Sequence, residues 1–274
     1  MKRNAGWRQC WGMSDSTSFS TSFSTTECEQ FERDGYAIVR GLVPAAMVAR
    51  MREVVLQHLA EVKQPVEYEA DTHYPGAPES RDAPGGRTVR RLLQAYARDA
   101  VFRDWALSPL IATRLAQLLG PHVVMSQAHH NCVMTKHPAY SSVTGWHRDI
   151  RYWSFEQSEL VSVWLALGEE HQRNGCLLLL PGSHRMEFQP GQLDKAQFLR
   201  TGFEENQSLL RTQIAAELHA GDVLFFHCRL FHAASHNRTT DTKLSVVHSY
   251  HSADNHPLLG TRSAALADLP LATE

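Results

Sequence analysis

The chain has 274 residues and nearly balanced charge, with 27 Lys plus Arg against 29 Asp plus Glu, which argues against nucleic-acid and membrane partners. This length can bury a sizeable core as one domain. The five scattered cysteines form no CxxC pair, and there is neither a secretion-signal pattern nor an apolar run long enough to span a bilayer. We therefore expect reduced thiols and a cytoplasmic protein.

The N-terminal residues 1–27 are predicted to be a disordered tail, followed by a single folded domain over 28–274. Within the tail, residues 14–27 repeat the pattern Ser-Thr-Ser-Phe. Such a low-complexity segment buries too little surface to offset the entropy lost on ordering. The first regular elements are then expected to be a helix capped at Thr25 or Thr26 and ended by Gly35, a strand over 36–40, and a helix from Pro44 to about His58.

A Pro- and Gly-rich stretch, residues 64–87, separates these elements from the rest of the chain. A loop of that length inside a domain is usually functional or mobile, so this loop is a candidate lid over the site. Three arginines follow: Arg87, Arg90 and Arg91. They fit a solvated helix face and a contact to an anionic substrate equally well.

The second half of the chain is predicted to be mostly strands. A helix over 96–119 precedes them, and a more helical, polar insertion over 186–212 interrupts them. Helices followed by a run of strands indicate an α+β fold, and seven or eight strands that must protect their edges suggest a double-stranded β-helix, or jelly roll. The expected strands are 123–135, 146–153, 160–168, 175–180, 222–227, 230–235 and 243–250.

One short motif, His147-Arg148-Asp149, suggests a metal site. On a strand, residues two apart point to the same face, so the imidazole and the carboxylate would converge. A second histidine from another strand would complete the 2-His-1-carboxylate facial triad of non-haem Fe(II) oxygenases. His232 is the favoured partner because it follows an apolar strand and precedes a polar turn; His227 and His236 compete with it, and the alternative reading is a core histidine.

Two strands offer side chains that could line a pocket at this site. Residues 243–250 alternate, with Lys243 and Ser245 on one face, where an ammonium and a hydroxyl could bind a carboxylate. The alternative is an edge-strand lysine that hinders aggregation. The strand before the motif is expected to line the pocket with His129, Asn131, Val133 and Thr135, and Asn131 is the preferred polar contact.

Four motifs, in consistent order from about residue 28 to 255, resemble the phytanoyl-CoA dioxygenase family. They are Phe31-Glu32-Arg33-Asp34-Gly35-Tyr36, Trp146-His147-Arg148-Asp149, Asn174-Gly175-Cys176 through Pro181-Gly182-Ser183-His184, and Gly221-Asp222 through His232 to Asn237. The resemblance implies a jelly-roll oxygenase, with helices packed on its core, that uses Fe(II), 2-oxoglutarate and O2. It further implies that His147, Asp149 and His232 bind iron, and that Trp164 and Trp153 are aromatic residues of the site.

The chain departs from this family at two positions. Where the family usually has an arginine that binds the distal carboxylate of 2-oxoglutarate, the chain has Lys243, and a common hydroxyl is replaced by Ala234. Lysine lacks the bidentate fork of arginine, so we expect Lys243 with Ser245 to bind the carboxylate and keep Arg238 as an alternative. The presence of Asp149 argues against halogenation, because halide-binding relatives lack this carboxylate.

Together these features predict a dioxygenase that hydroxylates or otherwise oxidises a C–H bond of a small molecule, releasing succinate and CO2. Two alternatives stay open. A zinc hydrolase could use the same three ligands, because zinc binds His and Asp and activates water. A non-catalytic relative would bind no metal. The substrate and the oligomeric state do not follow from these residues.

Overall fold

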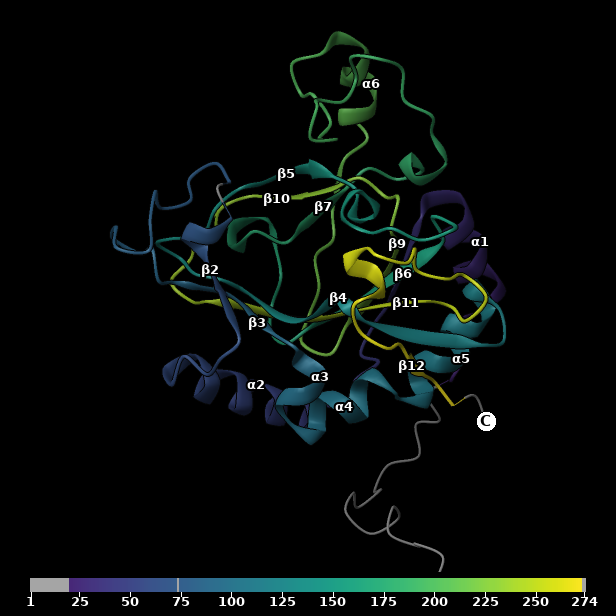
Figure 1. Ribbon diagram of the computed structural model, residues 1–274, viewed down its shortest axis with the longest axis horizontal. Coiled ribbons are helices and arrows are strands. Elements are labelled where there is room, and N and C mark those ends of the chain that lie inside the picture. The colour runs from purple at the N-terminus through teal and green to yellow at the C-terminus, as the bar shows by residue number, and fades with distance from the viewer. Residues whose placement is uncertain (1–19, 73, 273–274) are drawn as a thin grey trace, which may run out of the picture.

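The computed structural model describes residues 20–72 and 74–272, which form two antiparallel sheets with helices outside them (Figure 1). The helices are α1 (Thr25–Asp34), α2 (Ala45–Ala60), α3 (Ala95–Arg98), α4 (Ala100–Ala106), α5 (Pro109–Leu119) and α6 (Gln207–Leu210). The strands are β1 (Tyr36–Val39), β2 (Val66–Tyr68), β3 (Val89–Leu93), β4 (Val123–Lys136), β5 (Thr144–His147), β6 (Leu160–Ala166), β7 (Leu177–Leu179), β8 (Ile214–Ala215), β9 (Val223–His227), β10 (His232–Ala234), β11 (Lys243–Ser252) and β12 (Leu269–Pro270).

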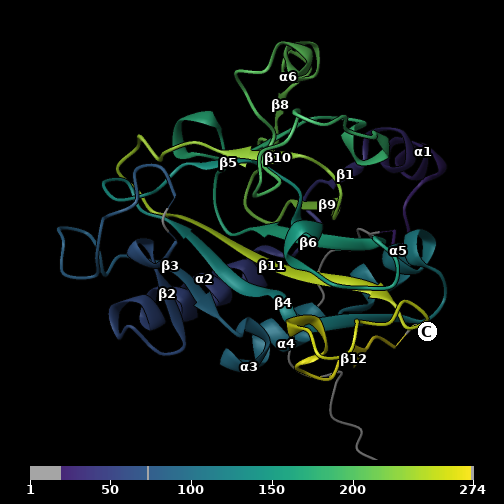
Figure 2. The ribbon, with the colours of Figure 1, turned by 45° about the horizontal axis from the view of Figure 1, so that its top comes forward.

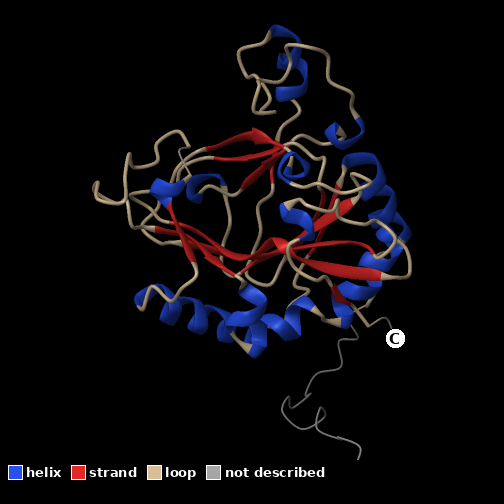
Figure 3. Ribbon diagram, viewed as in Figure 1, coloured by secondary structure: helices blue, strands red, loops and turns tan. Residues whose placement is uncertain are grey.

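The larger sheet has the strand order β1-β9-β6-β11-β4-β3-β2, with β12 added beside β4, and the smaller sheet has the order β5-β10-β7-β8. The two sheets face each other (Figure 2), and α2, α3 and α4 cover the outer face of the larger sheet (Figure 3). This arrangement confirms the α+β jelly roll with helices packed on it. In the part of the chain that the structure describes, no helix is both long and apolar enough to cross a membrane.

Burial on both faces explains why β6 is apolar almost throughout. All seven of its residues are buried. Val163 and Leu165 belong to the core between the larger sheet and the helices, together with Trp105. Trp164 points the other way, into the core between the two sheets, where it joins Phe226. Strand β6 therefore borders the space between the two sheets in which a site can lie.

The predicted boundary of the tail at residue 27 is wrong for its last residues. Phe23 is 4% exposed and its ring packs edge-on against Phe225, with 5.0 Å between ring centroids. Its backbone N–H donates to Gln117 Oε1 at 2.7 Å and its carbonyl accepts from Gln117 Nε2. A single aromatic side chain and paired backbone groups thus hold residues 20–24 against α5. Residues 1–19 of the predicted tail lie outside the described residues.

Three predicted elements differ from the observed ones. The helix expected over 96–119 is three helices, because Asp99 and Ser108 are extended and their side chains cap α4 and α5. The strand expected over 146–153 ends at His147, and a 3-10 turn follows over Asp149–Tyr152. The insertion 186–212 does lie between strands, beyond the smaller sheet (Figure 1), but its only α-helix is α6.

The segment 64–87 begins with regular structure, because β2 pairs with β3. After β2 the loop is tied to its surroundings at several points. Arg81 donates to the Asp71 carboxylate at 2.7 Å, and the Pro75 carbonyl accepts from Val143 N–H. The hydroxyls of Tyr74 and Tyr152 are 2.8 Å apart. Whether this loop moves as a lid stays a prediction.

Candidate active site

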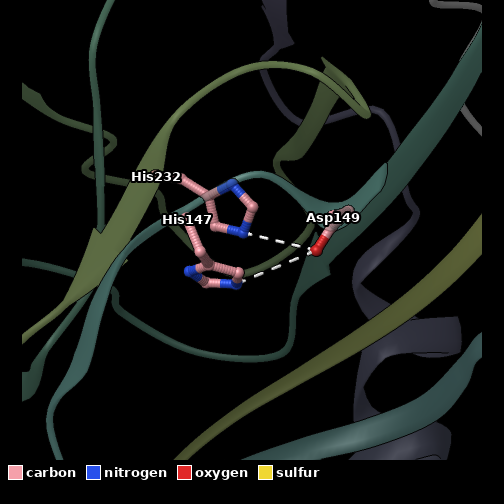
Figure 4. A group of neighbouring side chains, drawn as sticks. All are labelled: His147, Asp149 and His232. Carbon is pink, nitrogen blue, oxygen red and sulfur yellow. Dashed lines mark ion pairs between the residues drawn. The ribbon is translucent and has the colours of Figure 1, made fainter. Parts of the chain in front are cut away.

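The pairing of β5 with β10 brings the three predicted metal ligands together. His147 is the last residue of β5, and its Cα partner across the ladder is His232, the first residue of β10. Asp149 Oδ1 lies 3.9 Å from His147 Nε2 and 3.5 Å from His232 Nε2 (Figure 4). Candidate ligand atoms of the three residues all lie within 4.8 Å of one another, and the three side chains are buried. The predicted convergence is confirmed.

The reason for the convergence is not the one that strand alternation suggested. Asp149 does not continue β5, because the chain turns into the 3-10 segment at this residue. Arg148 is still extended, with φ −113° and ψ 137°, so it carries the backbone past His147 before the turn begins. The carboxylate therefore approaches the two imidazoles from a turn, while both histidines come from adjacent strands.

Both histidines keep one ring nitrogen free for a metal. His147 Nδ1 lies 2.8 Å from the Gly145 carbonyl oxygen, and His232 Nδ1 lies 3.0 Å from that of Leu230. A carbonyl can only accept, so each Nδ1 carries the proton and each Nε2 presents its lone pair to the site. Burial, with the nearby His232, lowers the pKa of His147 to about 3, which favours the neutral ligand form.

The second oxygen of Asp149 is held from behind. Ser162 Oγ donates to Asp149 Oδ2 at 3.1 Å, and His130 Nδ1 lies 3.5 Å from the same oxygen. Burial alone would raise the pKa of this carboxyl, but His130, His232, His147 and the Ser162 hydroxyl together hold it below its ordinary value. An ionised carboxylate and two neutral imidazoles are the donor set of a facial Fe(II) site, so these residues fit iron.

Two cavities meet at the triad. The inner cavity lies between the sheets and, besides the triad, is lined by Arg90, Arg91, His130, Met134, Thr135, Lys136, Thr144, Trp164, Gly175, Leu177, Phe226, Ala233, Ala234 and Lys243. The outer cavity measures about 300 Å³ and, besides His147 and Asp149, is lined by Glu67, Asp71, Thr72, Tyr74, Arg91, Leu93, His129, His130, Cys132, Tyr152, Trp153 and Arg262. A molecule in either cavity would reach the metal position.

Lys243 lines the inner cavity and Ser245 lies beside it, but both side chains already form hydrogen bonds with another side chain of the protein, Glu170. Lys243 Nζ donates to Glu170 Oε2 at 3.0 Å, and Ser245 Oγ donates to Glu170 Oε1 at 2.6 Å. Trp164 Nε1 donates to the same Oε1 at 2.9 Å, and its ring centroid lies 4.9 Å from Lys243 Nζ. Strand β11 lies between β6 and β4, so the edge-strand reading of Lys243 is wrong.

The pocket face predicted on β4 is only partly right. His129 lines the outer cavity and Thr135 the inner one. Val133 instead belongs to the core under the helices, and Asn131 Oδ1 accepts the backbone N–H of Tyr96 at 2.9 Å. The residues that share a face with Lys243, Ser245 and Val247 are their cross-strand partners Lys136, Met134 and Cys132. Asn131 is therefore on the wrong face to contact a ligand beside the triad.

The remaining predicted residues are divided between the site and the surface. Trp153 lines the outer cavity and stacks on His129, with ring centroids 5.0 Å apart. Arg238 is exposed and lines a separate surface cleft, so it does not face the triad. Arg87 is exposed beside Asp82, whereas Arg90 is buried against Glu69. The predicted solvated helix face is therefore wrong, because Arg90 and Arg91 lie on strand β3 and Arg87 lies in a turn; only Arg87 is exposed.

Three residues of the site were not singled out from the sequence. Glu170 follows β6 and forms an isolated bridge with Leu218 outside the named strands, where a charged residue gives no signal of burial. Lys136 ends β4 and is 8% exposed. His130 borders both cavities, but one of 16 histidines does not stand out by type. An alternation argument carried across the β4–β11 pair would have found Lys136, because cross-strand partners share a face.

The comparison with protein families identifies this architecture. The family model described as phytanoyl-CoA dioxygenase (PhyH) matches residues 31–245. The peroxisomal phytanoyl-CoA dioxygenase of Homo sapiens is 26% identical over 237 residues, covering 82% of this chain and 68% of the relative. Ectoine dioxygenase of Bordetella parapertussis is 24% identical over 254 residues, covering 86% and 78%.

Solved structures share the fold. EctD from S. alaskensis with 2-oxoglutarate and 5-hydroxyectoine matches with a TM-score of 0.70 and 23% identity over 89% of this chain and 81% of that one. The epimerase SnoN in complex with Fe3+, alpha ketoglutarate and nogalamycin RO matches with a TM-score of 0.68 and 21% identity over 91% and 95%. With the family match and the triad, these findings show that the chain belongs to the phytanoyl-CoA dioxygenase family and is an Fe(II)- and 2-oxoglutarate-dependent dioxygenase.

Proposed function

We propose that this dioxygenase hydroxylates, or otherwise oxidises, a C–H bond of a small polar molecule bound in the outer cavity. The observation that carries the proposal is that His147 and Asp149 line both cavities. Cosubstrate in the inner cavity and substrate in the outer cavity would then reach the metal position from two sides. Iron bound by the triad would supply oxygen activation coupled to the decarboxylation of 2-oxoglutarate.

The lining of the outer cavity supports a polar substrate rather than a bare hydrocarbon chain. Glu67, Asp71 and Arg262 bring charge, and the hydroxyls of Tyr74 and Tyr152 bring hydrogen-bonding groups. A hydrocarbon there would desolvate these groups without replacing their hydrogen bonds, which costs free energy. A family relative, EctD, was solved with 5-hydroxyectoine, which is also a small molecule.

The protein's own side chains would hold and orient the reactants. Trp153 and His129 form an aromatic wall against which a substrate can pack. Ser162 and His130 fix the Asp149 carboxylate, so that its position does not depend on the substrate. The buried aromatic residues around the triad exclude bulk water from the reacting atoms.

We also infer a cytoplasmic location, because the four cysteines in the described residues are all free.

The test is a screen of succinate formation by the iron-loaded enzyme against a panel of small polar molecules. A substrate should raise succinate formation above the rate without substrate, in one-to-one ratio with a product that is oxidised by mass spectrometry. Trp153→Ala should raise the Michaelis constant for that substrate about tenfold and leave the Michaelis constant for the cosubstrate unchanged, because the residue borders only the outer cavity. A rise in both constants would contradict the division between the two cavities.

A further inference from the structure

Four cationic side chains line the inner cavity, and three of them already have a carboxylate partner. The pairs are Arg90 with Glu69 at 3.2 Å, Arg91 with Glu67 at 3.3 Å and Lys243 with Glu170 at 3.0 Å. Lys136 is the exception, because no carboxylate of the described residues forms an ion pair with its ammonium. Its Nζ donates to the Ser142 carbonyl at 3.0 Å instead. Lys136 is therefore the one of these four cations that has no carboxylate at ion-pair distance among the described residues.

The position of Lys136 is fixed by its surroundings. It ends β4 directly opposite Lys243 on β11, and it is 8% exposed. Its backbone carbonyl accepts from Asn237 Nδ2 at 2.8 Å. Its side chain passes over Gly175, where an added Cβ would lie only 2.6 Å from Lys136 Cδ. The glycine thus leaves room for the lysine stem along the cavity wall.

An unneutralised buried ammonium is costly unless something compensates its charge. Burial, with the nearby Arg90 and Lys243, lowers the pKa of Lys136 to about 7. An anion bound in the inner cavity would remove this penalty. The lysine is thus arranged like the positive half of an ion pair whose negative half comes from a ligand.

2-Oxoglutarate is a dianion, so when one end binds at the metal its distal carboxylate needs a cation in the same cavity. Lys243 is poorly suited to this, because Glu170 takes its charge and also accepts from Ser245 and Trp164. A second carboxylate at Lys243 would lie beside the Glu170 carboxylate, and like charges at that distance repel strongly when buried.

We propose that Lys136 is the residue that binds the distal carboxylate of 2-oxoglutarate in this enzyme, and that the Lys243–Glu170 pair forms an electrically neutral floor beneath it. The proposal rests on 2-oxoglutarate as cosubstrate. It moves the cosubstrate's counter-ion from β11 to the facing residue of β4. The distal carboxylate still binds in the inner cavity, and only the strand that supplies its positively charged partner is different.

The experiment is an anaerobic titration of the Fe(II)-loaded enzyme with 2-oxoglutarate, followed by the absorbance of the iron–2-oxo-acid charge-transfer band. Lys136→Met should raise the Kd for 2-oxoglutarate about ten- to hundredfold, the range expected for a hydrogen bond to a charged group. It should not change the Kd for 2-oxobutyrate, which has no second carboxylate. Lys136→Arg should recover part of the affinity, and the exposed Lys195→Met is the matched control.

A double variant, Lys243→Met with Glu170→Gln, removes the pair without leaving a buried charge. It should shift the Kd for 2-oxoglutarate less than Lys136→Met does. The proposal is overturned if the double variant weakens 2-oxoglutarate binding and Lys136→Met does not. Equal weakening of both 2-oxo acids by Lys136→Met overturns it as well, because the lysine is then only structural. If the wild-type enzyme shows no charge-transfer band with 2-oxoglutarate, then 2-oxoglutarate is not the cosubstrate. If the wild type shows the band and Lys136→Met binds 2-oxoglutarate with the same Kd, only the role of Lys136 is refuted.

Discussion

The metal triad and the floor of the inner cavity are equally buried, yet they differ in what their polar atoms can still bind. His147 and His232 are 7% and 5% exposed, and Lys243 and Glu170 are 7% and 2% exposed. Backbone carbonyls hold the two imidazoles by Nδ1 and leave both Nε2 atoms free. In the floor of the inner cavity, the Lys243 ammonium and the Glu170 carboxylate neutralise each other's charge and share a hydrogen bond. Burial alone therefore does not distinguish a ligand from a structural pair; the remaining hydrogen-bonding capacity does.

Loss of a triad ligand should give the largest effect. His232→Ala removes one of three iron ligands, so iron affinity should fall by more than the roughly 10–100-fold seen for residues that only orient a ligand, and turnover should vanish. Circular dichroism should show an intact fold. The control is His227→Ala, since His227 pairs with Glu159 away from the triad. Equal loss of iron affinity in both variants would contradict the assignment.

Breaking the floor should cost stability rather than iron affinity. Lys243→Met leaves the Glu170 carboxylate buried without its cation, which should lower the free energy of unfolding by about 3–5 kcal/mol. Adding Glu170→Gln should restore most of that loss, because the replacement removes the uncompensated charge and keeps an oxygen that can accept from Trp164 and Ser245. Chemical denaturation of the two variants measures both effects. If Lys243→Met is as stable as the wild type, the pair is not a structural floor and the comparison fails.

The pH dependence of cosubstrate binding should give the smallest effect. Burial and the charges of Arg90 and Lys243 lower the pKa of Lys136 to about 7, with Glu69 opposing them. A bound carboxylate favours the protonated ammonium, so 2-oxoglutarate should bind best below pH 7 and weaken as Lys136 loses its proton above it. The Kd of the iron-loaded enzyme should rise roughly tenfold between about pH 6.5 and 8.5.

The matched variant for this effect is Lys136→Arg, because a guanidinium stays charged over the whole range. Its Kd for 2-oxoglutarate should be nearly independent of pH. An identical slope in the wild type and in Lys136→Arg would assign the titration to another group. The metal ligands do not interfere, since iron is bound to them throughout the measurement.

The family motifs and the hydrophobic patterns already predicted the fold and the triad. A run such as Leu160–Ala166 reports burial on both faces through its own composition. His147 and Asp149 are two residues apart, so their proximity needed only an extended Arg148 and a turn, even though the predicted strand was wrong. His232 could be chosen from the polar turn that follows it. These features depend on residues that are close together in the chain, so they can be predicted from the sequence alone.

Other parts of the site were decided only by the tertiary structure. Glu170 is 73 residues from Lys243 in the chain, and nothing near either residue indicates that they pair. The docking of Phe23 on Phe225 likewise depends on contacts across the whole domain. Asn131 has the right residue type for a pocket, but the register between β4 and β11 places it on the face opposite Lys243 and Ser245. Which charge is free and which is already neutralised is a property of distant neighbours, so the sequence supplied the charged residues and the folded arrangement determined which of them can bind a ligand.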